Sequence, residues 1–191
     1  MAVLDPKILD EFWEICNAAY ECWLCHRELF DDNPEAEQLS RSHCAPFLAH
    51  LSVVTQRDTL HQIAKLHDRA KQFGQNNLSI GFIIDNGYWD RETRMRLGTL
   101  RSNLDTFASL LKDARNKITA HNDLAARLLR PALGGFPDGA DVEYFKDLQA
   151  LVDIVAGSPR PFNDLVRNDA RVFVESLVRG VSMKAQLASL I

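Results

Sequence analysis

The sequence lacks several features that would assign it to well-known functional classes. No apolar run approaches the roughly 18 residues that a membrane-spanning helix needs. Residues 1–7 do not have the basic-then-apolar pattern of a signal peptide. No His-Glu-x-x-His arrangement, glycine-rich phosphate loop or nucleophile elbow is present. We therefore expect a cytoplasmic protein with no membrane contact, in which the four cysteines are reduced.

The few cysteines include one pattern that is typical of a bound group. Cys22 and Cys25 precede His26 in the order used for covalent haem attachment, but that chemistry belongs to exported proteins and the pattern falls within an expected helix. Three cysteines, Cys22, Cys25 and Cys44, could form a zinc site with either His26 or His43, although the spacing is not that of a zinc knuckle. We interpret the cysteines as small buried apolar residues and expect neither a metal nor another cofactor.

The net charge of −4 is unevenly distributed along the chain. Residues 91–130 contain nine Lys or Arg against four acidic residues, a surplus of +5. The first 90 residues contain seven basic and fourteen acidic residues, a deficit of −7. A basic segment in an acidic protein suits an anionic ligand, but helices are often charged unevenly and both signs can meet again in the fold.

Helical periodicity of apolar residues dominates the chain. Asp5 and Pro6 are typical of an N-cap followed by the first helical position, and Asn77 is expected to cap a short helix. No strand is expected, and only residues 80–84 are ambiguous between helix and strand. The helices are expected over about 6–30, 35–73 with a kink or restart near 42–46, 78–85, 90–119 with a further turn or two at 125–129, 141–156 and 163–190.

These elements predict an all-α fold, a bundle of long antiparallel helices with one or more of them kinked or broken. The length of 191 residues fits a single domain over 1–191. Its core is expected at about 5–130, with a C-terminal helical pair at about 141–190 packed on it. The loop at 131–139 either covers a functional cleft or links helices.

One cation is out of place on the longest amphipathic helix. Leu97, Leu104 and Leu111 belong to one apolar stripe, and a further step of four places Arg115 on the same face. An arginine is costly to bury there unless its guanidinium is paired or reaches an interface or cleft. His121 follows six residues later. This segment therefore directs the functional hypothesis.

The Arg115-to-His121 segment resembles the R-x(4–6)-H motif of the HEPN superfamily. Further similarity, at residues 63–68, 76–79 and 117–123, is to its abortive-infection (AbiU-type) branch. The resemblance implies a compact HEPN-like helical bundle and a metal-independent RNA-cleaving or RNA-binding effector, in prokaryotic phage defence or toxin–antitoxin biology. It also implies RNA as a ligand and a protein antitoxin or other partner.

The resemblance further implies that Arg115 and His121 are catalytic. The histidine would activate an RNA 2′-hydroxyl and the arginine would stabilise charge at phosphorus, leaving 2′,3′-cyclic phosphate ends. Imidazole is a neutral base at physiological pH, and the guanidinium fork matches phosphate oxygens. Asn116, Lys117 and Asp123 are supporting candidates, with helix termination, an ion pair with Asp113, and helix capping as their respective alternatives.

Geometry adds a constraint on this pair. On an unbroken helix, residues six apart point about 120° away from each other, so Arg115 and His121 do not stack. Either the helix bends near 119–122, or the cleft is shared across a two-fold dimer, as is usual in HEPN proteins. We expect a homodimer. Two alternatives stay open: an inactive HEPN-like dimerisation or interaction module, and Arg115 as a structural partner of a core carboxylate.

Overall fold

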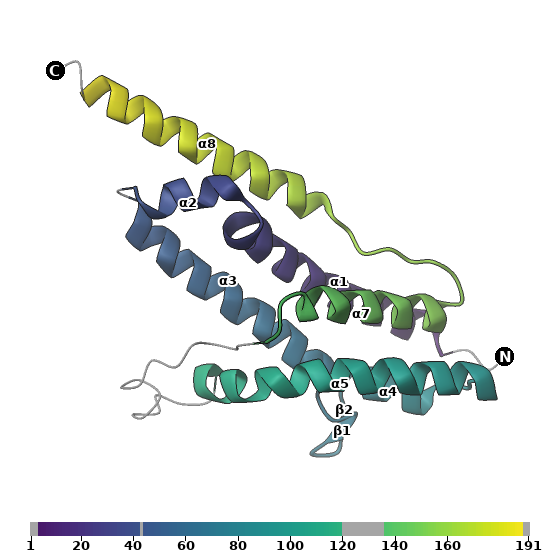
Figure 1. Ribbon diagram of the computed structural model, residues 1–191. Coiled ribbons are helices and arrows are strands. Elements are labelled where there is room, and N and C mark those ends of the chain that lie inside the picture. The colour runs from purple at the N-terminus through teal and green to yellow at the C-terminus, as the bar shows by residue number, and fades with distance from the viewer. Residues whose placement is uncertain (1–3, 43, 120–135, 189–191) are drawn as a thin grey trace. The chain divides into compact units, whose positions relative to one another are not determined.

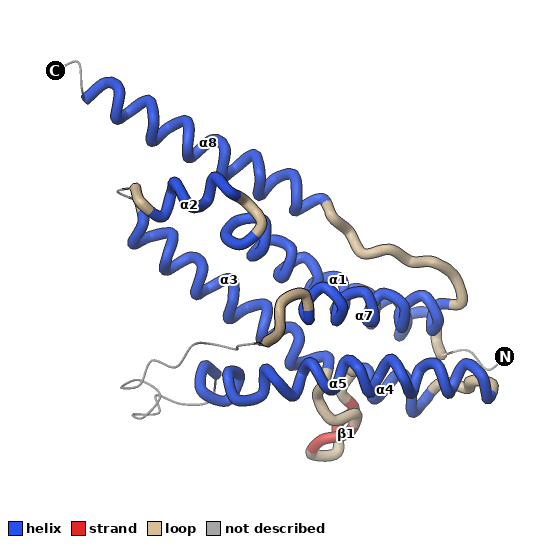
Figure 2. The backbone as a smooth tube through the Cα atoms, in the orientation of Figure 1, coloured by secondary structure: helices blue, strands red, loops and turns tan. Residues whose placement is uncertain are grey.

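The computed structural model describes residues 4–42, 44–119 and 136–188 (Figure 1). Helices make up most of the described backbone (Figure 2), and the all-α prediction is confirmed. No helix within the described ranges is long and apolar enough to cross a membrane. The elements are α1 (Pro6–His26), the π-helix η1 (Arg27–Asp31), α2 (Pro34–Ser40), α3 (Ala45–Leu66), β1 (Lys71–Gln72), β2 (Gln75–Asn76), α4 (Ile80–Asn86), α5 (Arg91–Thr119), α7 (Ala140–Ala156) and α8 (Leu165–Ala188).

The helix starts follow local capping chemistry. Asp5 Oδ1 accepts a hydrogen bond from the Lys7 amide at 2.9 Å, and Pro6 opens α1, as predicted. Asp90 Oδ1 accepts from the Thr93 amide at 2.7 Å at the start of α5. These caps satisfy amide groups that the first turn of a helix leaves without partners.

The second expected helix is interrupted, and its predicted end at residue 73 is wrong. A break separates α2 from α3 where a restart was expected, and α3 ends at Leu66. A short antiparallel hairpin follows, with Phe73 and Gly74 as its two turn residues at φ values of 50° and 82°. Positive φ at both positions closes a hairpin and is incompatible with a continued helix. The sequence indicated a turn at 74–77, but it did not indicate the two short strands or the end of the helix at Leu66.

The cap of α4 also differs from the prediction. The Ser79 hydroxyl, not Asn77, accepts the hydrogen bond from the Phe82 amide at 3.3 Å. Asn77 instead closes the base of the hairpin, because its side-chain amide donates to the Arg69 carbonyl at 2.8 Å. The helix therefore begins at Ile80, two residues later than expected.

The chain divides into two compact units, residues 1–18 with 60–162 and residues 19–59 with 163–191. In the first unit α5 packs against α7, and the predicted apolar stripe of α5 is buried at Leu97, Leu104, Phe107 and Leu111. In the second unit η1 and α2 pack against α8 around Leu39, Leu48 and Val174. The prediction of a single domain stays a prediction.

Candidate functional site

A cleft of about 650 Å³ lies in the first unit, next to α5. One side is formed by the end of α3 and the segment that follows it, including His67, Arg69 and Gln72. The other side is formed by α5, which contributes Asp105 and Leu111 among its lining residues. The cleft therefore joins polar and charged side chains to the apolar stripe of the longest helix.

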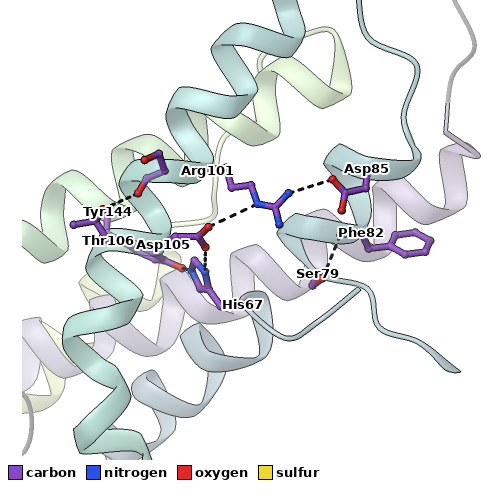
Figure 3. Close-up of polar contacts among 9 residues, drawn as sticks. His67, Ser79, Phe82, Asp85, Arg101, Asp105, Thr106 and Tyr144 are labelled. Carbon is purple, nitrogen blue, oxygen red and sulfur yellow. Dashed lines mark hydrogen bonds and ion pairs between the residues drawn. The ribbon is translucent and has the colours of Figure 1, made fainter. Parts of the chain in front are cut away.

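His67 is the central polar residue of this cleft (Figure 3). Its Nδ1 lies 2.9 Å from an Asp105 carboxylate oxygen, and its Nε2 lies 3.0 Å from the Tyr144 hydroxyl on α7. A neutral imidazole matches both partners when Nδ1–H donates to Asp105 and Nε2 accepts from Tyr144. The side chain is 10% exposed, so both hydrogen bonds matter to its stability. His67 thereby links three segments of the unit.

Burial decides the protonation state of this histidine. Loss of solvent lowers the pKa of His67 below its ordinary value, and the hydrogen bond and charge of Asp105 oppose that change. Burial likewise raises the pKa of the Tyr144 hydroxyl well above its usual range. Both groups are therefore neutral at physiological pH, and the Asp105 carboxylate supplies the negative charge of the cluster.

Asp105 is itself held by a second set of contacts (Figure 3). Arg101, one turn earlier on α5, lies 3.7 Å from Asp105 and 3.1 Å from Asp85 at the end of α4. These ion pairs are part-exposed and add little stability individually. Their consequence is positional, because they fix the carboxylate that orients the His67 ring.

The predicted catalytic residues fall at the edge of what the structure describes. Helix α5 continues without a break through Arg115, Asn116 and Lys117 to Thr119, which confirms the helical prediction for that segment. Leu111 lines the cleft, and Arg115 follows one helical turn later. The side chains from Lys112 to Thr119, and His121 and Asp123 altogether, lie outside the described residues. The pairing of Arg115 with His121 stays a prediction.

The haem-like and zinc-like residues have other partners in the second unit. The Cys22 thiol donates to Asp58 at 3.1 Å, and burial together with Asp58 raises its pKa to about 12. His26 Nδ1 lies 2.8 Å from the Thr55 hydroxyl, and Cys44 packs against the Leu39 cluster. Among the described residues, no three His, Cys, Asp or Glu side chains are grouped to hold a metal ion. His43 lies outside that set.

Sequence reasoning missed the role of His67 and Asp105. On α3, His50 and His61 are exposed, whereas His67, which follows the end of that helix, is hydrogen-bonded in the cleft. The sequence did not indicate that His67 lies in a cleft. Its partners lie 38 and 77 residues away in the chain, so no local spacing could reveal them.

Comparison with protein families gives a match to the AbiU2 family of HEPN domains over residues 6–173. The matched region contains every described residue of the cleft and the whole segment from Arg115 to Asp123. Searches of curated proteins and of solved structures give no match. Since the family model spans most of the chain, the resemblance inferred from the short motif extends to the whole fold, and the chain belongs to the AbiU2 family of HEPN domains.

Proposed function

We propose that this chain is a metal-independent endoribonuclease, in which His121 and Arg115 cleave RNA and leave 2′,3′-cyclic phosphate ends. The observation that carries the proposal is the family match, because it spans the Arg115-to-His121 motif and the fold around it. The cleft on α5 supports it, since Leu111 lines the cleft one turn before Arg115. The basic surplus of residues 91–130 suits a polyanion.

The two residues supply the groups that the reaction needs. His121 takes the proton of the 2′-hydroxyl, the 2′-oxygen attacks the adjacent phosphorus, and the 5′-oxygen leaves with a proton from solvent or a second acid. Arg115 offers paired N–H donors to the phosphate oxygens as negative charge develops on them. General base catalysis by a positioned histidine contributes roughly 10²–10⁴-fold in rate.

The proposal includes a homodimer whose two motifs share one cleft. An isologous interface would give Arg115 a role, because the helical period puts this arginine in line with the apolar stripe of α5 and a partner could meet the helix at that position. Light scattering at micromolar concentration should then give twice the 21.6 kDa chain mass. A monomeric mass under those conditions would contradict the shared cleft.

The biological setting follows from the family. We propose an effector in prokaryotic phage defence or a toxin–antitoxin pair, held inactive by a protein partner until it is triggered. Cleavage of RNA fits such a role, because it stops growth without any small-molecule product.

The central test is RNA cleavage by the full chain in the presence of EDTA. His121→Ala should lower the rate about 10²–10⁴-fold and Arg115→Ala about 10²–10³-fold. Matched controls are His61→Ala on α3 and Arg94→Ala on α5, both exposed and outside the cleft lining. The 5′ fragments should end in a cyclic phosphate, which acid converts to a monoester.

The same variants separate the alternatives. Equal cleavage by wild type and His121→Ala removes the catalytic assignment. A wild type that dimerises without cleaving any RNA indicates an inactive interaction module. If Arg115→Ala instead lowers the free energy of unfolding by about 3–5 kcal/mol, the arginine is a structural partner of a buried carboxylate.

A further inference from the structure

The hairpin between α3 and α4 holds one aromatic residue in an unusual position. Residues Lys71–Gln72 pair with Gln75–Asn76, and Phe73 and Gly74 form the connecting turn. Figure 1 shows this hairpin projecting below α5 and α4. The Phe73 side chain is 97% exposed, the most exposed large apolar residue among those described. Single exposed apolar residues are common on protein surfaces, so the meaning of this one depends on its backbone and its surroundings.

The backbone of Phe73 makes the choice of residue more informative. Its φ of 50° lies in the left-handed region, where the first turn position normally favours Asn, Asp or Gly. A bulky aromatic residue is unfavourable there. The backbone conformation of the turn therefore does not explain why phenylalanine occupies this position. The explanation must come from the exposed side chain.

The base of the hairpin is closed by hydrogen bonds between its two ends. The Asn77 amide donates to the Ala70 carbonyl at 2.9 Å, and the Asn77 side chain donates to the Arg69 carbonyl at 2.8 Å. These bonds join the chain just before the hairpin to the chain just after it. Phe73 therefore lies at the tip of a stem whose base is held by hydrogen bonds.

The surroundings of the ring are polar and cationic. Lys71, Gln72, Gln75 and Asn76 are all exposed, and no other residue from 69 to 77 is aromatic or larger than alanine among the apolar types. An aromatic residue that binds a protein partner is normally surrounded by contacts that exclude water, and Phe73 has no apolar neighbours of that kind within the hairpin. Amide and cationic side chains next to one aromatic ring instead match the groups that bind single-stranded nucleic acid.

The hairpin also belongs to the candidate site. Arg69 and Gln72 line the cleft together with His67 and Asp105. A strand of RNA that lies in this cleft would therefore meet the stem of the hairpin, and its next base would meet the tip. Two cations, Lys71 and Arg69, lie two and four residues before the ring along the chain.

We propose that Phe73 is the base-stacking element of the RNA site: an unpaired base stacks on its ring while Arg69 and Lys71 contact the adjacent phosphates. The ligand class is single-stranded RNA or an unpaired loop, because a base within a duplex has no free face. This inference rests on the proposed action on RNA. It adds the residue that selects unpaired substrate.

The test measures binding of a labelled single-stranded RNA of roughly 12 nucleotides to the full chain in EDTA. The His121→Ala background prevents cleavage during the measurement. Phe73→Ala should weaken binding about 5- to 150-fold, the loss expected for one stacked base. Phe73→Trp should retain binding, and its added fluorescence should be quenched by single-stranded RNA but not by duplex. Tyr88→Ala, which removes an exposed aromatic outside the cleft lining, is the matched control.

Each outcome decides between the two proposals. If wild type cleaves RNA through His121 while Phe73→Ala binds and cleaves normally, the stacking inference is wrong and the proposed function stands. If Phe73→Ala weakens RNA binding but wild type shows no cleavage, the stacking role stands and catalysis fails. If wild type neither binds nor cleaves RNA, both fail. Loss of a protein partner by Phe73→Ala, with RNA binding unchanged, would assign the ring to that partner and overturn the inference.

Discussion

Each of the two units contains a polar cluster that joins helices distant in the chain, and the clusters differ in charge. In the first unit a neutral His67 lies between Asp105 and Tyr144 and lines the cleft. In the second unit the carboxylate of Glu28, 4% exposed, lies between Arg167 and Arg171 of α8. The His67 cluster is built around an imidazole whose pKa is lowered by burial, whereas the Glu28 cluster joins one carboxylate to two guanidinium groups. The first therefore suits a site, and the second suits a structural link.

The largest effect on stability is expected at Glu28. Glu28→Ala removes the shared partner of two arginines and should lower the free energy of unfolding by about 2–3 kcal/mol. This is less than for a fully buried pair, because Arg167 and Arg171 are 41% and 54% exposed and regain water. Urea denaturation of the full chain measures the change.

Two controls sharpen this result. Glu37→Ala removes an exposed carboxylate paired with Arg41 on α2 and should cost less than about 1 kcal/mol. Arg171→Ala should cost more than Arg167→Ala, since Arg171 Nε donates to Glu28 at 2.7 Å and Arg167 Nε lies 3.2 Å away without an aligned hydrogen bond. Equal losses of the free energy of unfolding for Glu28→Ala and Glu37→Ala would show that the buried Glu28 cluster stabilises the chain no more than the exposed ion pair of Glu37.

The two clusters also show what sequence periodicity detects. The stripe at Leu104 and Leu111 predicted a buried face on α5, because helical packing repeats every three or four residues. Asp5, Pro6 and Asp90 predicted helix starts, since caps act within one turn. Local chemistry of this kind is fully encoded in neighbouring residues.

Contacts between distant segments leave no such pattern. Glu28 meets Arg171 across 143 positions, and His67 meets Tyr144 across 77, so neither cluster was predicted. The hairpin was missed for another reason: residues 74–77 indicated a turn, but Phe73 is a poor residue for the first position of a hairpin turn. The sequence thus predicted the helices from local patterns. The cleft could be recognised only once the fold had brought distant segments together.

A smaller loss of stability is expected when the His67 cluster loses one hydroxyl. Tyr144→Phe keeps the ring that packs on Phe107 but leaves His67 Nε2 buried without its partner. The free energy of unfolding should fall by about 1–2 kcal/mol, the cost of one unmade buried hydrogen bond. Urea denaturation again measures it, and Tyr88→Phe at an exposed position should stay within about 0.5 kcal/mol of wild type. An unchanged stability for Tyr144→Phe would mean that water replaces the hydroxyl and that the cluster is open to solvent.

The smallest and most specific effect is a pH dependence that separates the clusters. Because burial lowers the pKa of His67, the unfolded chain binds the proton more readily than the folded chain. Stability from this group is therefore complete above the ordinary histidine pKa of about 6.5 and is lost as pH falls from there to the lowered value. His67→Gln should flatten that part of the curve, measured by urea denaturation between about pH 7.5 and 5.5.

His26 also has a pKa lowered by burial, so His67→Gln leaves part of the dependence of stability on pH and adding His26→Gln removes more of it.

Asp105 opposes the lowering of the His67 pKa, whereas Arg101 adds to it. Asp105→Asn should therefore lower the pKa of His67 further and extend the loss of stability to lower pH, as followed by NMR titration of the imidazole. The Glu28 cluster contains no histidine, so Glu28→Gln should leave the slope in this range unchanged. A His67 pKa at or above about 6.5 would show that Asp105 outweighs burial, and the imidazole would then be a charged partner like the arginines of the second unit.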